Sequence, residues 1–200
     1  MRLDHLAIAA TSLDEGVAWV EERLGVPCLA GGKHARFATH NRLLGLGQGI
    51  YLEVIAPDLS ATCERPRWFG LDHFSGPPRL ANWICEVPDL AAALDDAPEA
   101  GNVPMQRGDL RWDMAVPDDG SLPMDGGFPT LLQWHTDTPP GTRLPDSGVE
   151  LVELVVQHPQ AGDLSAQLSG QLADPRIRFE TAAKPALNAR LTTPRGMVTL

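Results

Sequence analysis

Hydrophobic and polar positions follow a two-residue period at the start of the chain and a helical period directly after it. Across residues 3–10, apolar side chains alternate with a second row that contains His5, which is the pattern of a β-strand. Residues 12–15 (Ser-Leu-Asp-Glu) form a helix capping box, and Gly25 marks the end of that helix. The apolar stripe between them predicts one buried helix face, made of Leu13, Val17, Val20 and Leu24.

Three short strands follow this helix, so the order of elements is βαβββ. We place them at residues 28–32, 41–46 and 50–56, with glycine-containing turns between them. Residues 45–49 (Gly-Leu-Gly-Gln-Gly) superficially suit a dinucleotide-binding loop. They join two strands and open no helix, however, so they predict a tight hairpin instead.

The same order of elements recurs twice further along the chain. The second pass begins with a strand at 81–87 and a helix capped by Asp89, and the third begins with a strand at 149–156. The later strands of these passes are predicted at 103–107, 110–116, 130–136, 177–181, 186–191 and 197–200, and the third helix carries Leu164, Leu168 and Leu172. The chain then divides into a first unit (1–58), a connecting segment (59–79), a second unit (80–138) and a third, degenerate unit (148–200).

A single βαβββ unit leaves one face of its sheet uncovered, so it must pair with another unit. The predicted fold class is α/β (α+β), with repeated units paired around a cleft in a curved sheet. The third unit can pack beside the pair or find its mate in a second subunit. The latter arrangement would make a homodimer.

Composition and charge exclude several kinds of partner. The chain is 43% hydrophobic, with 16 basic and 26 acidic residues and a net charge of −10, which would repel nucleic acids and anionic lipids. No window approaches the roughly 20 apolar residues of a membrane helix, and the amino terminus lacks the pattern of a secretory signal. The three cysteines are widely spaced, which fits a reducing compartment. We expect a cytoplasmic protein whose partner is a small molecule.

Two ionisable residues lie where chemistry is expected. His5 shares its strand face with small alanines, above which a cleft can form. Glu53 lies in an otherwise apolar strand, where a carboxylate costs free energy unless it is paired, protonated or bound to a metal. These positions suggest a catalytic or metal-binding pair. The alternative for His5 is a core histidine bonded to a backbone carbonyl.

Polar residues near the predicted second and third strands are further candidates. His34 and Asn41 would bind a ligand at the rim of the cleft, or else cap backbone groups of turns. The connecting segment contains Arg65-Pro66-Arg67-Trp68-Phe69 and lacks clear periodicity, so it predicts a lid or binding loop, or alternatively a packed surface strap.

Several segments together resemble a known family. They are His5, residues 31–34 (Gly-Gly-Lys-His), 38–43 (Ala-Thr-His-Asn-Arg-Leu), 51–56 (Tyr-Leu-Glu-Val-Ile-Ala) and 132–134 (Leu-Gln-Trp). This series is similar to the glyoxalase-like domain family of the vicinal oxygen chelate superfamily. The resemblance implies paired βαβββ units around a ligand cleft. It also implies that metal-dependent members hold one divalent ion with about four side chains from the first and last strands of two units.

The resemblance extends to a set of four positions. Aligning the caps Ser12 and Asp89 places Asn82 opposite His5, and aligning the last strands places Gln133 opposite Glu53. Gln133 would then face the cleft and its neighbour Trp134 the core. An imidazole and a carboxylate suit zinc, nickel, manganese or iron, whereas the two amides are weak donors better suited to hydrogen bonding.

Three functions follow from these residues. The first is a lyase or isomerase in which a divalent ion on His5 and Glu53 polarises a substrate while a carboxylate moves a proton. The second is a metal-free module that binds and sequesters a small molecule through Asn82 and Gln133. The third is metal-free proton transfer by Glu53 with His5 or His34, which requires that burial raise the pKa of Glu53.

Overall fold

The computed structural model describes residues 1–63, 65–97 and 99–200. The first unit consists of β1 (Arg2–Ala9), α1 (Leu13–Leu24), β2 (Leu29–His34), the short helix η1 (Ala35–Phe37), β3 (Thr39–Gly45) and β4 (Tyr51–Pro57). The Ser12 hydroxyl accepts a hydrogen bond from the Glu15 backbone N–H, and Gly25 ends α1 with a φ of 74°. β3 and β4 pair as the predicted antiparallel hairpin, so residues 45–49 form a turn.

The second unit repeats this order. It consists of β5 (Arg79–Glu86), α2 (Leu90–Ala93), β6 (Ala100–Arg107), β7 (Leu110–Pro117), η2 (Pro123–Gly126) and β8 (Thr130–Trp134), and the short α3 (Pro140–Arg143) follows. Asp89 caps α2 as predicted, but the helix makes only one turn. Asp95 and Asp96 follow it, where acidic charge opposes the negative end of a helix dipole.

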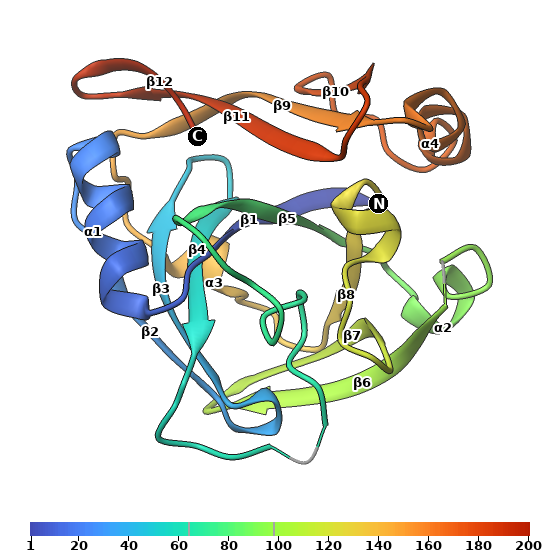
Figure 1. Ribbon diagram of the computed structural model, residues 1–200, viewed down its shortest axis with the longest axis horizontal. Helices are drawn as coiled ribbons and strands as arrows, with labels where there is room; N and C mark the ends of the chain where they lie inside the picture. The colour runs from blue at the N-terminus through green and yellow to red at the C-terminus, as the bar shows by residue number, and fades with distance from the viewer. Residues whose placement is uncertain (64, 98) are drawn as a thin grey trace.

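Eight strands of these two units form one strongly curved sheet. Its order is β2-β3-β4-β1-β5-β8-β7-β6, with β1 and β5 antiparallel at the centre (Figure 1). In each unit the first strand pairs in parallel with the last, β1 with β4 and β5 with β8. The two edges approach each other, because the Arg36 side chain near β2 donates to the carbonyl of Pro104 on β6. The sheet therefore encloses an interior, as expected for paired units.

The third pass along the chain has the same order of elements but a different strand pairing. It comprises β9 (Glu150–His158), α4 (Ala161–Leu168), β10 (Ile177–Thr181), β11 (Ala186–Thr193) and β12 (Gly196–Thr199). These strands form a separate sheet of order β10-β9-β11-β12, in which β9 pairs in parallel with β10 rather than with β12. The third unit is therefore not a topological copy of the first two.

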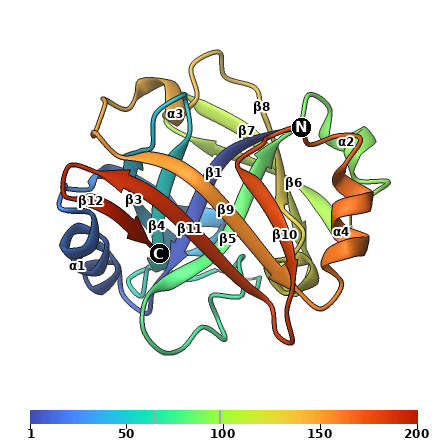
Figure 2. The ribbon, with the colours of Figure 1, turned by 90° about the horizontal axis from the view of Figure 1, so that it is seen from above.

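The four-stranded sheet covers the convex side of the eight-stranded one. Seen from above, β9 and β11 cross over β1 and β5 (Figure 2). Leu6 and Ile8 of β1 and Trp83 of β5 share one buried core with Leu154 of β9 and Leu191 of β11. Within this chain, the third unit thus packs beside the pair, which is one of the two arrangements expected from the sequence.

The connecting segment enters the interior of the curved sheet. Trp68, Phe69 and Leu71 are at most 5% exposed and belong to a second core with Ala7 of β1 and Ile84 of β5. The Trp68 ring stacks against Phe37 on one side and Phe69 on the other. The segment is therefore part of the core, rather than the surface strap considered from the sequence.

No helix among the described residues is long and apolar enough to cross a bilayer.

Candidate functional site

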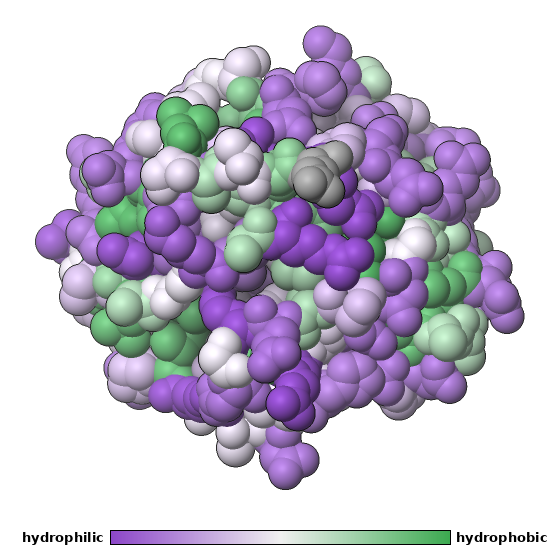
Figure 3. All heavy atoms as spheres, turned by 90° about the horizontal axis from the view of Figure 1, so that it is seen from below, coloured by the Kyte–Doolittle hydropathy of each residue, from purple (hydrophilic) through white to green (hydrophobic). Residues whose placement is uncertain are grey.

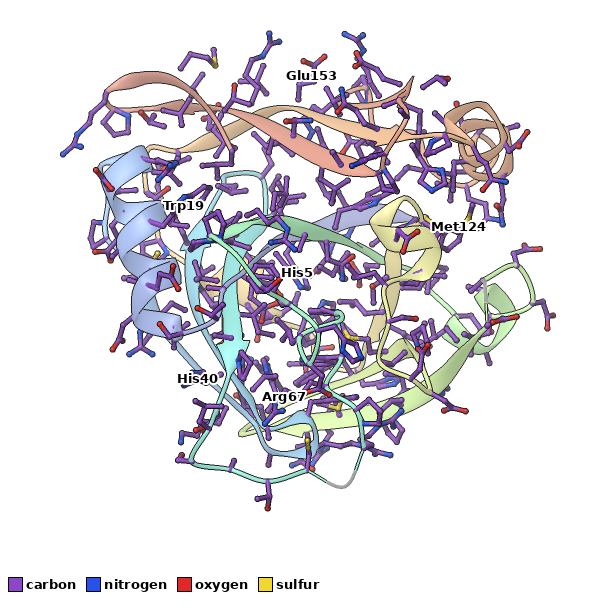
Figure 4. All side chains as sticks on the ribbon, viewed as in Figure 1. His5, Trp19, His40, Arg67, Met124 and Glu153 are labelled. Atoms are coloured by element: carbon purple, nitrogen blue, oxygen red, sulfur yellow. The ribbon has the colours of Figure 1, made fainter. Side chains whose placement is uncertain are left out.

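His5 and Glu53 meet inside the curved sheet. The alternation predicted for β1 holds at this point, because Leu6 and Ile8 face the outer core while Ala7 and Ala9 face the inner one. Glu53 of β4 pairs with Ala7 of β1, and this places its Oε2 3.6 Å from Nε2 of His5. Both residues are about 5% exposed, and His5 lies near the centre of the molecule (Figure 4).

A second carboxylate holds the other side of the His5 ring. Nδ1 of His5 lies 2.6 Å from Oδ1 of Asp4, although neighbours on a regular strand point to opposite faces. The β1–β5 pairing shifts here: Leu3 is opposite Cys85 and His5 is opposite Ile84, so Asp4 is an extra residue in a β-bulge. The bulge explains why adjacent side chains meet. Trp134 Nε1 donates to the other Asp4 oxygen at 2.9 Å.

These contacts keep His5 charged. Burial alone would lower the pKa of His5, but the hydrogen bond to Asp4 and the nearby carboxylates of Asp4 and Glu53 together outweigh it and raise the pKa to about 9. Burial is the largest single influence on Glu53 and would raise its pKa, but the contact with His5 and the hydrogen bond from Asn41 together outweigh it and lower that pKa to about 2. At neutral pH the site therefore contains an imidazolium between two carboxylates. The Tyr51 ring stacks on the His5 ring at 4.5 Å between centroids.

Asn41 connects Glu53 to the backbone of β2 and to β6. Its amide nitrogen donates to Oε1 of Glu53. Its carbonyl oxygen accepts from the Gly32 backbone N–H at 2.7 Å and from Arg107 at 3.3 Å. An alanine at position 31 would place its Cβ 2.1 Å from that oxygen, so the close approach requires Gly31.

His34 lies beside this group in the neutral form. Burial is the main cause that lowers the pKa of His34 to about 4, and the nearby Arg107 guanidinium adds to it. Arg107 Nη1 lies 3.0 Å from Nε2 of His34 and can only donate, so Nε2 is the acceptor and the ring proton is on Nδ1. That N–H donates to the Thr39 hydroxyl, which also accepts from Trp68 Nε1.

A cavity of about 20 Å³ lies among these groups, which is room for about one water molecule. Its lining combines polar and ionisable residues with aromatic and apolar ones. These residues are His5, His34, Asn41, Tyr51, Glu53, Trp68, Phe69, Arg107, Trp112, Met114, Leu132 and Trp134. Four of the six residues singled out from the sequence are in this lining, namely His5, His34, Asn41 and Glu53.

Asn82 lies in the core and does not line the cavity. It is fully buried, its amide donates to the Thr130 hydroxyl at 2.9 Å, and its carbonyl accepts from the Trp83 backbone N–H. The residue two positions after Asn82, Ile84, pairs with Thr130, just as Ala7 pairs with Glu53. Thr130 is therefore the positional equivalent of Glu53 in the second unit.

The expected orientation of Gln133 and Trp134 is wrong. Gln133 accepts from the Leu90 backbone N–H and donates to the Pro88 carbonyl, so it supports the start of α2 outside the cavity. Trp134 faces inward and lines the cavity. The alignment of strand ends failed because β8 ends at Trp134 and not at Thr136 as predicted, so Gln133 is three positions past the true equivalent of Glu53.

The residues present do not fit a divalent metal ion. With Thr130 in place of the expected Gln133, the four equivalent positions hold His5, Glu53, Asn82 and Thr130, and the last two are hydrogen-bonded to each other. Within the described ranges, no group of three or more His, Cys, Asp and Glu side chains is arranged to hold a metal. The Arg107 guanidinium, which also lines the cavity, would oppose a cation. Two strong donors are fewer than protein metal sites of this kind use.

Comparison of the sequence with known families agrees with this architecture. A model described as "glyoxalase-like domain" matches residues 3–172. The chain belongs to the glyoxalase-like domain family. No functionally curated protein matches the sequence.

A solved structure with a TM-score above 0.5 shares the fold. A hypothetical protein from Staphylococcus aureus is 14% identical, with a TM-score of 0.63 over 92% of this chain and 87% of that one. Methylmalonyl-CoA epimerase from Mycobacterium tuberculosis is 19% identical, with a TM-score of 0.45 over 66% of this chain and 85% of that one. At these identities the similarity concerns the fold and does not assign a reaction.

Proposed function

We propose that this protein is a metal-independent isomerase or lyase that moves a proton on a small carbonyl compound, with Glu53 as base and His5 and Arg107 as stabilisers of negative charge. One observation carries the proposal: the His5 imidazolium contacts Glu53 at the wall of a buried cavity that Arg107 also lines. Strongly shifted pKa values gathered in one cavity are typical of reactive sites.

The resting ion pair keeps Glu53 unreactive until a substrate enters. At a pKa of about 2, a carboxylate is a poor base. A substrate carbonyl oxygen that accepts the Nε2–H of His5 would weaken the 3.6 Å ion-pair contact between His5 and Glu53. Burial, the largest single influence on Glu53, would then raise its pKa toward the range of a useful base. Metal-free proton transfer by Glu53 requires such a raised pKa.

The proposed step is abstraction of a proton from the carbon next to the carbonyl. The C–H electron pair becomes the carbon–carbon double bond of an enolate, the proton goes to Glu53, and the negative charge moves to the oxygen. His5 and Arg107 stabilise that oxyanion with donors already in place. Return of the proton to the opposite face of the same carbon inverts that centre, which is an isomerisation. In an elimination, the proton stays on Glu53, the carbonyl re-forms, and a leaving group on the next carbon departs with its bonding electrons.

A solvent-exchange experiment tests the proposal. Protein treated with a chelator is incubated in D₂O with 2-oxobutanoate and dihydroxyacetone, and deuterium at the carbon next to the carbonyl is measured by NMR. We expect exchange that Glu53→Gln lowers at least a hundredfold. Glu150→Gln, at an exposed position on β9, is the matched control and should keep full activity. Exchange that persists in Glu53→Gln would contradict Glu53 as the base.

Binding of oxalate, a planar mimic of an enolate, tests the charge arrangement separately. Oxalate should raise the melting temperature of the wild-type protein but not of His5→Gln or Arg107→Gln. Stabilisation by oxalate without any exchange would favour the second candidate, a metal-free module that only binds its ligand. That candidate is favoured by the small, aromatic-walled cavity, although Asn82 and Gln133 do not line it.

A further inference from the structure

A much larger cleft lies between the eight-stranded sheet and the four-stranded sheet. Its volume is about 650 Å³, within the range of small-molecule sites. Its walls come from α1, the connecting segment, the start of β5, η2 and the segment that leads into β11. Trp19 of α1 lies at one side of the cleft, beneath the four-stranded sheet, whereas His5 lies deeper in the molecule (Figure 4).

The cleft combines apolar walls with two cationic side chains, Arg79 and Lys184, and one carboxylate, Asp125. Trp19, Phe74, Leu122 and Leu187 contribute apolar surface. By contrast, the molecular face opposite the four-stranded sheet is mostly hydrophilic, and its apolar residues form small separate areas (Figure 3).

Two cations at this cleft have no ion-pair partner. Arg79 and Lys184 both line it, and among the described residues neither has a carboxylate within 4.0 Å. Arg79 instead lies over the Phe74 ring at 4.1 Å and donates to the Ser75 carbonyl. Lys184 is exposed and is one of only two lysines in the chain. In a protein with a net charge of −10, unpaired cations beside apolar walls favour an anionic ligand with an apolar body.

Phe69 separates this cleft from the small cavity. Among the described residues, it alone lines both spaces. Its backbone φ is 60° and that of Gly70 is 64°, so Phe69 holds a left-handed conformation that non-glycine residues rarely adopt. The Trp68 ring is held by its hydrogen bond to Thr39, whereas the Phe69 ring is held by packing alone, including its stacking on Trp68.

We propose that this cleft binds an amphipathic organic anion and that Phe69 is the movable wall between it and the His5–Glu53 cavity. The apolar body lies against Leu187 and Phe74, and the carboxylate, sulfonate or phosphate group contacts Lys184 and Arg79. That this anion is the part of the substrate remote from the carbonyl group rests on the proposed function. Its binding in the cleft is independent of that function.

Binding of 8-anilinonaphthalene-1-sulfonate to the full chain tests the cleft. Its fluorescence should rise on binding, and its Kd should increase about fivefold in Lys184→Ala and in Arg79→Gln. Arg190→Gln, which removes a cation that lies near Glu153 on the same sheet, is the control and should leave Kd unchanged. The uncharged probe N-phenyl-1-naphthylamine should bind wild type and Lys184→Ala equally. Equal sulfonate binding by all variants would overturn the proposal.

Lysine acetylation gives a second readout that does not depend on variants. Mass spectrometry should show that the sulfonate protects Lys184 at least threefold, while Lys33, which pairs with Asp58 elsewhere, keeps its rate. Equal protection of both lysines, or of neither, would place the probe outside the cleft.

The role of Phe69 is tested by exchange of deuterium into the ring of His5. Phe69→Ala should speed this exchange several-fold, because it joins the two spaces. Phe74→Ala, which lines only the cleft, should leave the rate unchanged. An unchanged rate in Phe69→Ala would remove Phe69 as the wall. If the sulfonate binds as expected but Glu53→Gln retains carbonyl exchange, the cleft stands and the proposed reaction fails.

Discussion

Arg107 on β6 donates a hydrogen bond to Nε2 of His34 on β2, across 3.0 Å and 73 positions of sequence. β2 and β6 are the two edge strands of the eight-stranded sheet, so this bond joins its ends through side chains rather than through a backbone ladder. It also brings a guanidinium from the second unit to the polar residues of the first. The candidate site is thus built from both units, although its carboxylates come from one.

The neutral state of His34 predicts a loss of stability in mild acid. Its folded pKa is about 4 and its ordinary value is 6.5, so between these values the unfolded chain binds more protons. The stabilisation is complete above pH 6.5 and is lost as pH falls toward 4. Between pH 7 and pH 5, we expect the wild-type free energy of unfolding to fall by about 2 kcal/mol more than that of His34→Gln. Urea unfolding at both pH values measures this, and parallel curves would contradict it.

The charged state of His5 predicts the opposite behaviour in alkali. Its folded pKa of about 9 exceeds the ordinary 6.5, so the stabilisation is complete below pH 6.5 and is lost as pH rises through 9. From pH 7 to pH 9, the wild type should lose about 2 kcal/mol relative to His5→Gln. The same urea experiment applies, and an NMR titration of the ring should give a midpoint well above 6.5. A midpoint at or below 6.5 would refute the imidazolium.

Gly31 supports the site by allowing Asn41 to come close. In Gly31→Ala, the new Cβ would overlap the Asn41 carbonyl group, so we expect a loss of about 1–3 kcal/mol and a shift in the titration of His5, because Glu53 loses its amide donor. Gly162→Ala is the matched control, since nothing lies within 4 Å of its Cβ position on α4. It should be neutral or stabilising by up to about 1 kcal/mol. Similar losses in both variants would argue against this role of Gly31.

Gln133 should matter for stability and not for ligand binding. Gln133→Ala removes the acceptor for the Leu90 N–H at the start of α2, which should cost about 1 kcal/mol in thermal or urea unfolding. Oxalate and the naphthalene sulfonate should bind it as they bind the wild type. Loss of oxalate binding with unchanged stability would restore Gln133 as a ligand-binding residue.

Local signals explain how much the sequence could predict. The alternation around His5, the cap at Ser12 and the glycine turn at 45–49 all depend on neighbours within a few positions, and the structure confirms them. Strand pairing in the third unit depends on longer-range packing instead. The order of elements from residue 149 onward was predicted correctly. The hydrophobic period of these strands, however, does not show whether β9 pairs with β10 or with β12.

The missed site residues have no periodic signature. Asp4 faces His5 only because one extra residue bulges from β1, and alternation assigned it to the other face. Arg107 reaches the site because the sheet curves until its edges meet, which no local pattern encodes. Trp134 was assigned to the wrong face because β8 ends two residues earlier than predicted. For Asp4, the only sequence signal is an acid next to a histidine. Arg107 and the inward face of Trp134 can be assigned only once the fold is known.

The packing of Trp68 and Phe69 inside the curved sheet has a consequence for cooperativity. The segment that joins the two units also fills the space between them, so neither unit has a complete core without it. Fragments cut within residues 59–79 should therefore not fold separately, and the two units should unfold in one transition rather than two. Movement of Phe69 then disturbs a core that both units share, so opening of the site depends on the global stability of the protein.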